Sequence, residues 1–327
     1  MLLTTTNERG SGLSGFRQVH TAGWIERFTH RGYSGVTPLG SGVEGATYRL
    51  GDGAVAKVWG RRREAELVRM QGFYLDVARA GLPFATPVIL RVEEVDGVAV
   101  TFEQELYGQP LQQRLAVEDV ELDPAAMDCV VEVLRALASV PGTDAMREMP
   151  VLDEECPLWA GTDDFPSALV ALLERRVARF GGTLRSHVPD FDRRYTRILE
   201  KLDALDSVPT TVIHGDLFGE NILVDDRLRP VSVLDFGFLS TAGDPRLDAS
   251  ITAATMNMYG PHAPAIAAAA TDRFAADLGY SVEAMLIYRA AYAVATSNVF
   301  TPDGSDGHFL WCVAQLTGAD LTAALDL

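Results

Sequence analysis

Lysine is nearly absent from this chain. It occurs only at Lys57 and Lys201, so 26 of the 28 basic residues are arginine. The bias as a whole is typical of a genome with a preferred base composition, and it excludes no class of function. It does set Lys57 apart, because a chain that otherwise uses arginine has kept a compact ammonium group there. We therefore treat Lys57 as a candidate functional residue.

Cysteines are few and far apart in the sequence. Cys129, Cys156 and Cys312 are odd in number and show no C-x-x-C spacing, which argues against a disulfide framework and against a cysteine-ligated zinc site. The first residues contain no basic stretch followed by an apolar one, as a secretory leader would. Residues 263–270 are rich in alanine but too short to span a bilayer. We therefore expect a cytoplasmic protein in a reducing compartment where ATP is available.

Positive charge is scarce in the second part of the chain. The whole sequence has a net charge of −17, while residues 1–105 carry 12 acidic and 12 basic residues. Residues 106–327 carry the remaining 33 acidic and 16 basic residues. This excess disfavours nucleic acid and anionic membranes as partners and favours a cationic ligand. Surface carboxylates that only promote solubility would give the same composition.

Two acidic clusters in this second part flank Trp159. Asp153-Glu154-Glu155 and Asp163-Asp164 lie in a stretch with a loop-like composition. Their carboxylates could bind ammonium groups of a substrate while the tryptophan stacks on a ring. A solvated loop is the alternative interpretation.

The most informative stretch lies at residues 211–237. A short apolar strand leads into His214-Gly215-Asp216, Asn221 follows, and a second strand ends in Asp235-Phe236-Gly237. Phosphoryl transfer from a nucleotide needs a carboxylate at the attacking hydroxyl, with an amide and a second carboxylate on the metal ions that bridge the phosphates. This ordered pair of motifs supplies those groups from two adjacent loops. It predicts a kinase-type centre in which Asp216 is catalytic and Asn221 and Asp235 bind Mg²⁺.

A glycine-rich segment precedes these motifs in the chain. The residues Gly40, Ser41, Gly42 and Gly45 belong to a G-x-G-x-x-G pattern, which also occurs in dinucleotide folds and in ordinary hairpins. A dinucleotide site needs a helix to begin at the glycines, whereas residues 46–59 have the pattern of two strands joined by a Gly-Asp-Gly turn. We therefore expect a hairpin whose backbone amides cover the phosphates of a nucleotide.

Lys57 lies on the second strand of this predicted hairpin, where it would pair with the α- and β-phosphates. Its expected partner is a glutamate of the next helix, which Glu64 and Glu66 open. These two residues are two positions apart and so point to different faces of the helix. We prefer Glu64. Either carboxylate could instead be a solvated side chain that is favourable to the helix dipole.

Together, these residues resemble the aminoglycoside phosphotransferase family of kinase-like enzymes over roughly residues 35–250. The most specific element is His214-Gly215-Asp216 with Asn221, and Gly243-Asp244-Pro245 with Asp248 matches a further motif of the family. Six residues separate the Asp-Phe-Gly motif from Asp244, which leaves no room for the activation segment of a protein kinase, and no Ala-Pro-Glu follows. A phosphorylation-switched protein kinase is therefore disfavoured.

The resemblance implies an α+β, two-lobed, protein-kinase-like fold. We expect a small β-rich nucleotide-binding lobe at residues 1–105, with residues 1–15 frayed, and a larger, mainly helical catalytic and substrate-binding lobe at 106–327. The hinge of the family would fall at residues 103–106, where backbone groups bond the nucleotide base. Gln104 and Leu106 therefore join the predicted nucleotide site.

The function implied is transfer of the γ-phosphoryl group of ATP or GTP, with Mg²⁺, to a hydroxyl of a small cationic molecule. Inactivation of an aminoglycoside is the leading hypothesis, followed by a macrolide or basic peptide antibiotic. A metabolic kinase for choline, a hydroxy amino acid or a fructosamine is the alternative. A nucleotide-binding pseudokinase is disfavoured because Lys57, Asp216, Asn221 and Asp235 are all intact.

Overall fold

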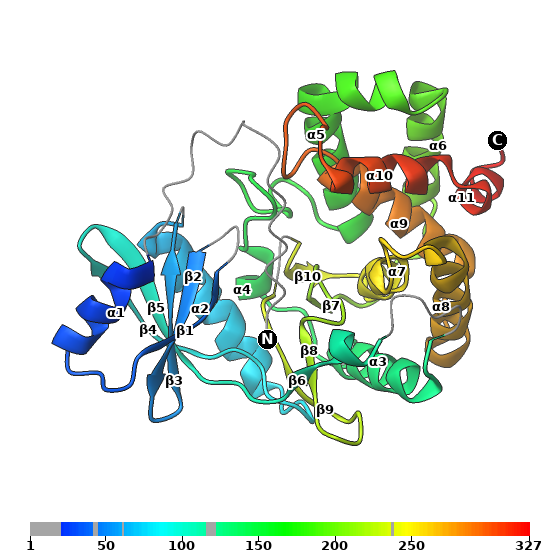
Figure 1. Cartoon of the computed structure of the whole chain (residues 1–327). Coiled ribbons are helices and arrows are strands. Elements are labelled where there is room, and N and C mark those ends of the chain that lie inside the picture. The colour runs from blue at the N-terminus through cyan, green and yellow to red at the C-terminus, as the bar shows by residue number, and fades with distance from the viewer. Residues whose placement is uncertain (1–20, 42–44, 61, 116–121, 237–238) are drawn as a thin grey trace. The chain divides into compact units, whose positions relative to one another are not determined.

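The structure, a computed structural model, describes residues 21–41, 45–60, 62–115, 122–236 and 239–327 (Figure 1). The chain divides into two compact units. The first unit comprises residues 1–79 and 86–107, and the second comprises residues 80–85 and 108–327. The predicted nucleotide-binding residues fall in the first unit, and the His-Gly-Asp and Asp-Phe motifs fall in the second.

The first unit is built around one antiparallel sheet with the strand order β1-β2-β3-β5-β4. A tight hairpin joins β2 to β3 through Asp52 and Gly53, which both have positive φ (53° and 73°) as a type I′ turn requires. The bounds of the elements are α1 (Thr21–His30), β1 (Thr37–Ser41), β2 (Gly45–Gly51), β3 (Ala54–Trp59), α2 (Glu64–Arg79), β4 (Ile89–Val95) and β5 (Val98–Gln104).

Aromatic side chains fill the core of the first unit between α1 and the sheet. Phe28 of α1 is fully buried and contacts the rings of Trp24, Tyr33, Tyr48 and Phe102. On β2 the buried residues alternate with more exposed ones, as expected for a strand with one face on a core. This core holds the sheet that carries the glycine-rich segment and Lys57.

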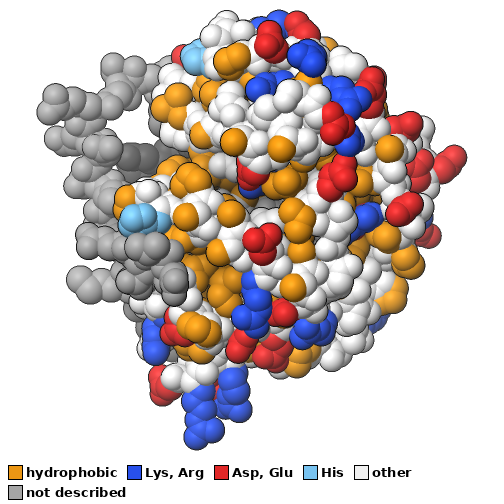
Figure 2. All heavy atoms as spheres, turned by 90° about the vertical axis from the view of Figure 1, so that its right-hand side faces the viewer, with side chains coloured by type: hydrophobic (Ala, Val, Ile, Leu, Met, Phe, Trp, Pro, Cys, Tyr) orange, Lys and Arg blue, Asp and Glu red, His pale blue; other side chains and the backbone are white. Residues whose placement is uncertain are grey.

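The second unit consists of helices and three short strand pairings. Two small antiparallel sheets have the orders β6-β8-β9 and β10-β7. On the face that carries α8 and α11, acidic and basic side chains are interspersed with hydrophobic ones (Figure 2). The bounds are β6 (Gln109–Pro110), η1 (Leu111–Arg114), α3 (Pro124–Leu137), α4 (Asp144–Arg147), α5 (Phe165–His187), α6 (Phe191–Asp203), β7 (Thr211–Ile213), β8 (Ile222–Val224), β9 (Pro230–Val233), β10 (Thr241–Gly243), α7 (Arg246–Thr255), α8 (Ala263–Leu278), α9 (Val282–Thr296), α10 (Gly307–Thr317) and α11 (Ala319–Ala324).

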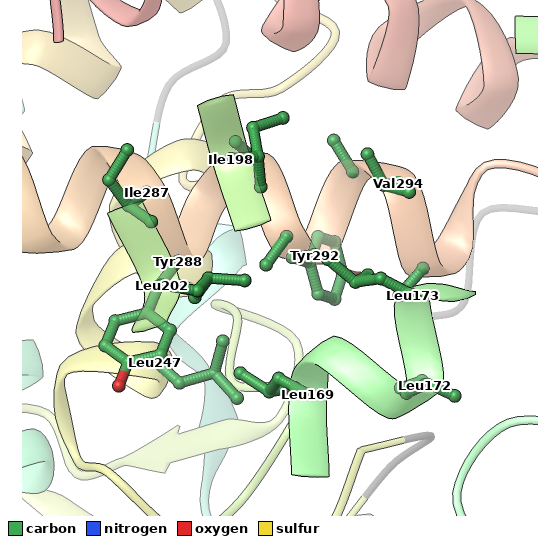
Figure 3. Packing of buried hydrophobic residues seen from close by; sticks show 14 of the residues in the cluster. Leu169, Leu172, Leu173, Ile198, Leu202, Leu247, Ile287, Tyr288, Tyr292 and Val294 are labelled. Carbon is green, nitrogen blue, oxygen red and sulfur yellow. The ribbon is translucent and has the colours of Figure 1, made fainter. Parts of the chain in front are cut away.

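Helix α9 forms the centre of the second unit. Every residue from Ala284 to Thr296 is buried, so this helix has no solvent face. Its side chains pack against leucines and isoleucines of α5, α6 and α7, among them Leu169, Ile198 and Leu247 (Figure 3). The helix is therefore a rigid support for whatever surrounds it.

Helix α5 is longer than its sequence pattern predicts. The pattern favours a helix that ends at Phe180, because Gly181 and Gly182 follow. The structure continues the helix to His187, with Gly181 and Leu184 buried against neighbouring elements. Tertiary packing of the apolar face has overridden the low helix propensity of two glycines.

The predicted α+β class is confirmed, since the first unit is rich in strands and the second is mainly helical. Within the described residues, no helix combines the length and the apolar character that a membrane span needs.

Candidate active site

Strand β7 delivers the His-Gly-Asp loop in the second unit. Gly215 has φ 76°, and a Cβ atom there would lie 2.4 Å from the carbonyl carbon of Leu239, so the loop has room only for glycine. His214 is fully buried, and its ring stacks on Phe236 at 4.5 Å between centroids. The loop is thus held tightly up to Asp216, which is half-buried.

Hydrogen bonds connect Asn221 to both loops that carry the predicted catalytic and metal-binding residues. Asn221 donates from Nδ2 to the backbone carbonyl of Asp216 at 2.9 Å. Its own carbonyl accepts the backbone N–H of Leu234 at 2.8 Å, and Leu234 directly precedes Asp235. Strands β8 and β9 pair in this region with Ile222 opposite Val233. The structure therefore ties Asn221 to Asp216 and to the residue before Asp235 within one unit.

His214 fixes the loop and does not take part in proton transfer. Its Nε2 donates to the carbonyl of Leu234 at 2.7 Å, and its Nδ1 accepts the N–H of Asp216 at 3.2 Å. This pattern requires the neutral tautomer with the proton on Nε2. Burial lowers the pKa of His214 to about 4, so the ring stays neutral at physiological pH. The imidazole links the two loops that carry Asp216 and Asp235.

Asp248 clamps the same loop from α7. Its two carboxylate oxygens accept the backbone N–H groups of His214 and Gly215 at 2.7 and 2.9 Å. Burial raises the pKa of Asp248 to about 6, despite these two hydrogen bonds that favour the charged form. In the sequence, Asp248 stands out only as part of a family motif. Its position three residues after Pro245 was the signal that could have pointed to its role in holding the loop.

Asp244, the other acid of that motif, is used for structure. Arg246 binds it through the Nε and Nη2 atoms, and the hydroxyl of Tyr288 donates to it at 2.7 Å. Asp244 is 3% exposed, so these contacts compensate a buried charge. They fasten the start of α7 to α9 and thereby hold Asp248 in place.

The oxygen ligands at Asn221 and Asp235 suit a magnesium ion. Because Nδ2 of Asn221 is used by Asp216, the Oδ1 atom is the end of the amide left to bind a cation. Asp235 exposes its side chain and has a φ of 40°, an unusual backbone for a residue other than glycine that often marks a functional site. Among the described residues, no group of three or more His, Cys, Asp or Glu is placed to hold a metal. Phosphate oxygens would have to complete the coordination, as Mg²⁺ commonly requires.

In the first unit, Lys57 lies on β3 opposite Thr47 of β2 and Thr101 of β5. Its ammonium group lies 4.2 Å from the centroid of the Trp59 ring, two residues further along the same face of the strand. The indole N–H of Trp59 donates to Thr101 at 3.0 Å, which fixes the ring. Trp59 therefore holds the stem of Lys57 in a defined place on the sheet.

The glycine-rich segment crosses from β1 to β2. Gly40 and Ser41 are the last residues of β1, where they pair with Thr47 and Ala46. A Cβ atom on Gly45 would lie 1.9 Å from the carbonyl oxygen of Val58, so the close approach of β2 and β3 requires glycine there. Gly42 lies outside the described residues, as does Gly237 of the Asp-Phe-Gly motif.

The two candidate partners of Lys57 open α2. Glu64 is the first residue of the helix and is exposed. Glu66 is engaged locally, because its carboxylate accepts the backbone N–H of Arg63 at 3.1 Å and pairs with the Arg63 guanidinium at 3.3 Å. The choice of Glu64 stays a prediction.

Gln104 is the last residue of β5, and Leu106 lies two positions further along the chain. The backbone N–H of Gln104 donates to Val88 at 3.1 Å, so this donor is already used. The neighbouring Glu105 is buried, and it holds the segment through its N–H, which donates to Gly53, and through an ion pair with Arg49 at 2.6 Å. The segment is thus fixed from both sides.

The acidic clusters around Trp159 serve the fold. Asp153 forms ion pairs with Arg176 and Arg179 of α5, and Glu154 pairs with Arg175. These arginines hold the pKa of Asp153 below its usual value even though burial opposes the shift. Asp164 caps α5 through the N–H of Ser167, so three of the five candidate substrate carboxylates have internal roles.

Trp159 is also committed to the interior. Its indole N–H donates to the carbonyl of Ala242 at 2.8 Å, and its ring packs beside Phe165 and Arg147. The side chain is 9% exposed, so the ring is not presented to a ligand. The loop pattern of the sequence gave no sign of these partners, which come from distant parts of the chain.

Comparison with known proteins identifies the family. A family model described as the phosphotransferase enzyme family, APH, matches residues 35–286, which include every predicted site residue. The chain belongs to this family. It is therefore a small-molecule phosphotransferase, and both the resemblance and the enzyme class predicted from the sequence are confirmed. A search of curated proteins found no match.

Solved structures with the same fold include three phosphotransferases. Aminoglycoside phosphotransferase APH(3″)-Id of Streptomyces rimosus is 21% identical, with 83% of this chain and 97% of that chain covered and a TM-score of 0.54. APH(2″)-IIa in a ternary complex with streptomycin and ATP is 13% identical, with coverages of 91% and 96% and a TM-score of 0.59. Macrolide 2′-phosphotransferase MphH of Brachybacterium faecium is 18% identical, with coverages of 90% and 97% and a TM-score of 0.53. At these identities the likeness establishes the kinase-like fold.

Proposed function

We propose that this phosphotransferase moves the γ-phosphoryl group of ATP or GTP to a hydroxyl of a small cationic molecule, and that antibiotic inactivation is its role. The observation that carries the proposal is the pair of hydrogen bonds that ties Asn221 to Asp216 and to Leu234, the residue before Asp235. Similar structures contain nucleotides together with an aminoglycoside, which supports an aminoglycoside as the first acceptor to test. Because the reaction consumes nucleoside triphosphate, we place it in the cytoplasm.

The candidate site residues of the second unit have distinct roles in this proposal. Asp216 orients the acceptor hydroxyl and takes its proton as the new P–O bond forms. Asn221 and Asp235 hold Mg²⁺, which when bound neutralises charge on the phosphates. His214 and Asp248 keep the loop of Asp216 in the geometry that the transfer needs.

The first unit supplies the nucleotide site in this proposal. Lys57 pairs with the α- and β-phosphates while Glu64 orients it, and the backbone at Gly40, Ser41, Gly42 and Gly45 covers the phosphates. Backbone groups between Gln104 and Leu106 bond the base. Since the N–H of Gln104 is used by Val88, the base must use other groups of the segment.

A coupled assay of ADP or GDP release tests the proposal. Purified protein is screened with Mg²⁺ and ATP or GTP against aminoglycosides, macrolides, basic peptide antibiotics, choline, hydroxy amino acids and fructosamines. On the best acceptor, Asp216→Asn should lower kcat by about 10²–10⁴-fold, the usual contribution of a positioned acid–base group. Nucleotide affinity should change little.

A matched control lies ten residues along the same region. Asp226 is exposed in a turn, and Asp226→Asn makes the same chemical change away from the network, so it should keep full turnover. An Asp216→Asn enzyme as active as the Asp226→Asn enzyme would refute the catalytic assignment. A best acceptor that proves to be choline or a hydroxy amino acid would favour the metabolic alternative.

A further inference from the structure

A groove runs between α8 and α10 in the second unit, with α9 as its floor. We call it the α8–α10 groove. Its volume is about 620 Å³, and small-molecule sites usually fall in the range of roughly 300–1,000 Å³. The alanine-rich run noted in the sequence forms one wall, because the side chains of Ala267 and Ala268 are too small to fill the space beside α10.

The walls of this groove are mainly apolar, and part of that surface faces solvent. Tyr259 and Leu310 line it, with 71% and 60% of their surfaces exposed. Isolated exposed hydrophobic residues need no explanation, but two of them flanking one concavity are typical of a binding site. A ligand with a large apolar surface would cover both side chains.

One end of the groove carries an ion pair in otherwise apolar surroundings. Arg289 of α9 is 4% exposed and donates from Nη2 to Asp320 at 2.5 Å. Its Nε is buried and has no hydrogen-bond partner among the described residues, so this guanidinium is only partly satisfied.

The same pair has no net charge, but its carboxylate end is the exposed one. Arg289 holds the pKa of Asp320 below its usual value although burial opposes the shift, so Asp320 stays ionised. The side chain of Asp320 is 45% exposed, while that of Arg289 is 5% exposed. A ligand in the groove therefore meets a carboxylate, and residues 106–327 as a whole carry 33 acidic and 16 basic residues. Charge complementarity favours a cationic ligand.

Trp311 connects this groove to the proposed catalytic loop. Its ring forms part of the groove wall and packs edge-on against Tyr292 of α9, at 6.1 Å between ring centroids. Helix α7 links the groove to this loop more directly, because Ala254 lines the groove and Thr252, two residues earlier, donates to the carbonyl of Leu217 at 2.8 Å. Leu217 directly follows Asp216, so one helix joins the wall of the groove to the proposed catalytic loop.

We propose that the α8–α10 groove binds the body of the acceptor molecule, and that this acceptor is a cation with a large apolar surface whose ammonium group pairs with Asp320. This inference rests on the proposed function of the same site. It favours an amphipathic amine over a polyhydroxylated polycation, because the walls offer apolar surface and a single exposed carboxylate. The hydroxyl to be phosphorylated would extend past Trp311 towards Asp216.

Calorimetric titration of the full-length protein with erythromycin, an amphipathic amine, tests the groove directly, and streptomycin is the polar comparison. Ala268→Trp places a large ring in the groove from the exposed side of α8. Ala269→Trp makes the same change at an exposed neighbour that does not line the groove, so it controls for helix propensity and stability. We expect Ala268→Trp to weaken erythromycin binding at least tenfold and Ala269→Trp to leave it at the wild-type value. Asp320→Asn should weaken it several-fold at low salt and less at high salt.

The outcomes separate this inference from the proposed function. The assignment of the groove as a binding site would be overturned if the wild type did not bind erythromycin, or if the two tryptophan variants bound it equally. If streptomycin is phosphorylated while erythromycin does not bind, the transferase function stands and the groove assignment is wrong. If erythromycin binds in a manner sensitive to Ala268→Trp but no acceptor is phosphorylated, the groove stands and the proposed function fails.

Discussion

Replacement of Asp248 by asparagine is the sharpest test of how the catalytic loop is held. The wild-type carboxylate accepts two backbone N–H groups, one from His214 and one from Gly215. An asparagine of the same shape has one acceptor oxygen and one NH₂ group. One backbone N–H would therefore face another donor, and the peptide planes just before Asp216 would shift.

The effect on stability can be worked out from the pKa of Asp248. Burial raises this pKa from 3.8 to about 6, which corresponds to about 3 kcal/mol against the ionised form in the folded protein. Because the folded pKa is the higher one, the stability linked to this proton is present at low pH and is lost as the pH rises through 6. Between pH 5.0 and 7.5 the wild type should lose about 1.4 kcal/mol that Asp248→Asn, which has no such proton, does not lose.

Urea unfolding of both proteins at pH 5.0 and 7.5 measures this difference. Any contribution of His214 to the pH dependence of stability is present in both proteins, so it largely cancels when they are compared. We expect the stability of the wild type relative to Asp248→Asn to fall by about 1.4 kcal/mol over this range, while the same comparison with Asp226→Asn stays flat. Turnover at pH 7.5 should fall about 10–100-fold in Asp248→Asn, since small displacements of a reacting group have effects of this size. A pH-independent difference combined with wild-type turnover would refute the clamp.

Other perturbations test the remaining parts of the molecule. Asp235→Ala should abolish Mg²⁺-dependent phosphoryl transfer, since the ion loses an anionic ligand, and residual turnover above about 1% of wild type at saturating Mg²⁺ would contradict that role. Gly45→Ala should lower the thermal midpoint by several degrees even without nucleotide, because its Cβ would lie 1.9 Å from the carbonyl oxygen of Val58; an unchanged midpoint would show that the strands can separate cheaply. Asp153→Asn should reduce the free energy of unfolding by about 1–3 kcal/mol, because Arg176 is 2% exposed and loses a charged partner, while the acceptor KM stays constant; a raised KM at unchanged stability would restore Asp153 to the substrate site. The KM for a cationic acceptor should rise with added KCl more than the KM for the nucleotide, and a flat salt series would remove the case for electrostatic attraction.

The candidate catalytic and metal-binding residues could be named from the sequence because their signals are local. Asp216, Asn221 and Asp235 lie within twenty residues of one another, and each lies close to one end of a short strand, so their order and spacing define the motif without reference to distant segments. The hairpin of β2 and β3 was predictable for the same reason, since its turn residues need positive φ wherever they occur. These features led from the sequence to the family.

The roles of the acidic clusters, the length of α5 and the α8–α10 groove were decided by tertiary contacts. Asp153 finds its arginines about three to four turns into a helix that begins twelve residues later, and Trp159 finds its acceptor at Ala242. Nothing near these residues in the sequence indicates such partners, because the partners approach only when the second unit packs around α9. The sequence alone could indicate which side chains are candidates for the phosphoryl transfer. Packing of the second unit decided which carboxylates stabilise the fold and placed Asp320 beside a groove.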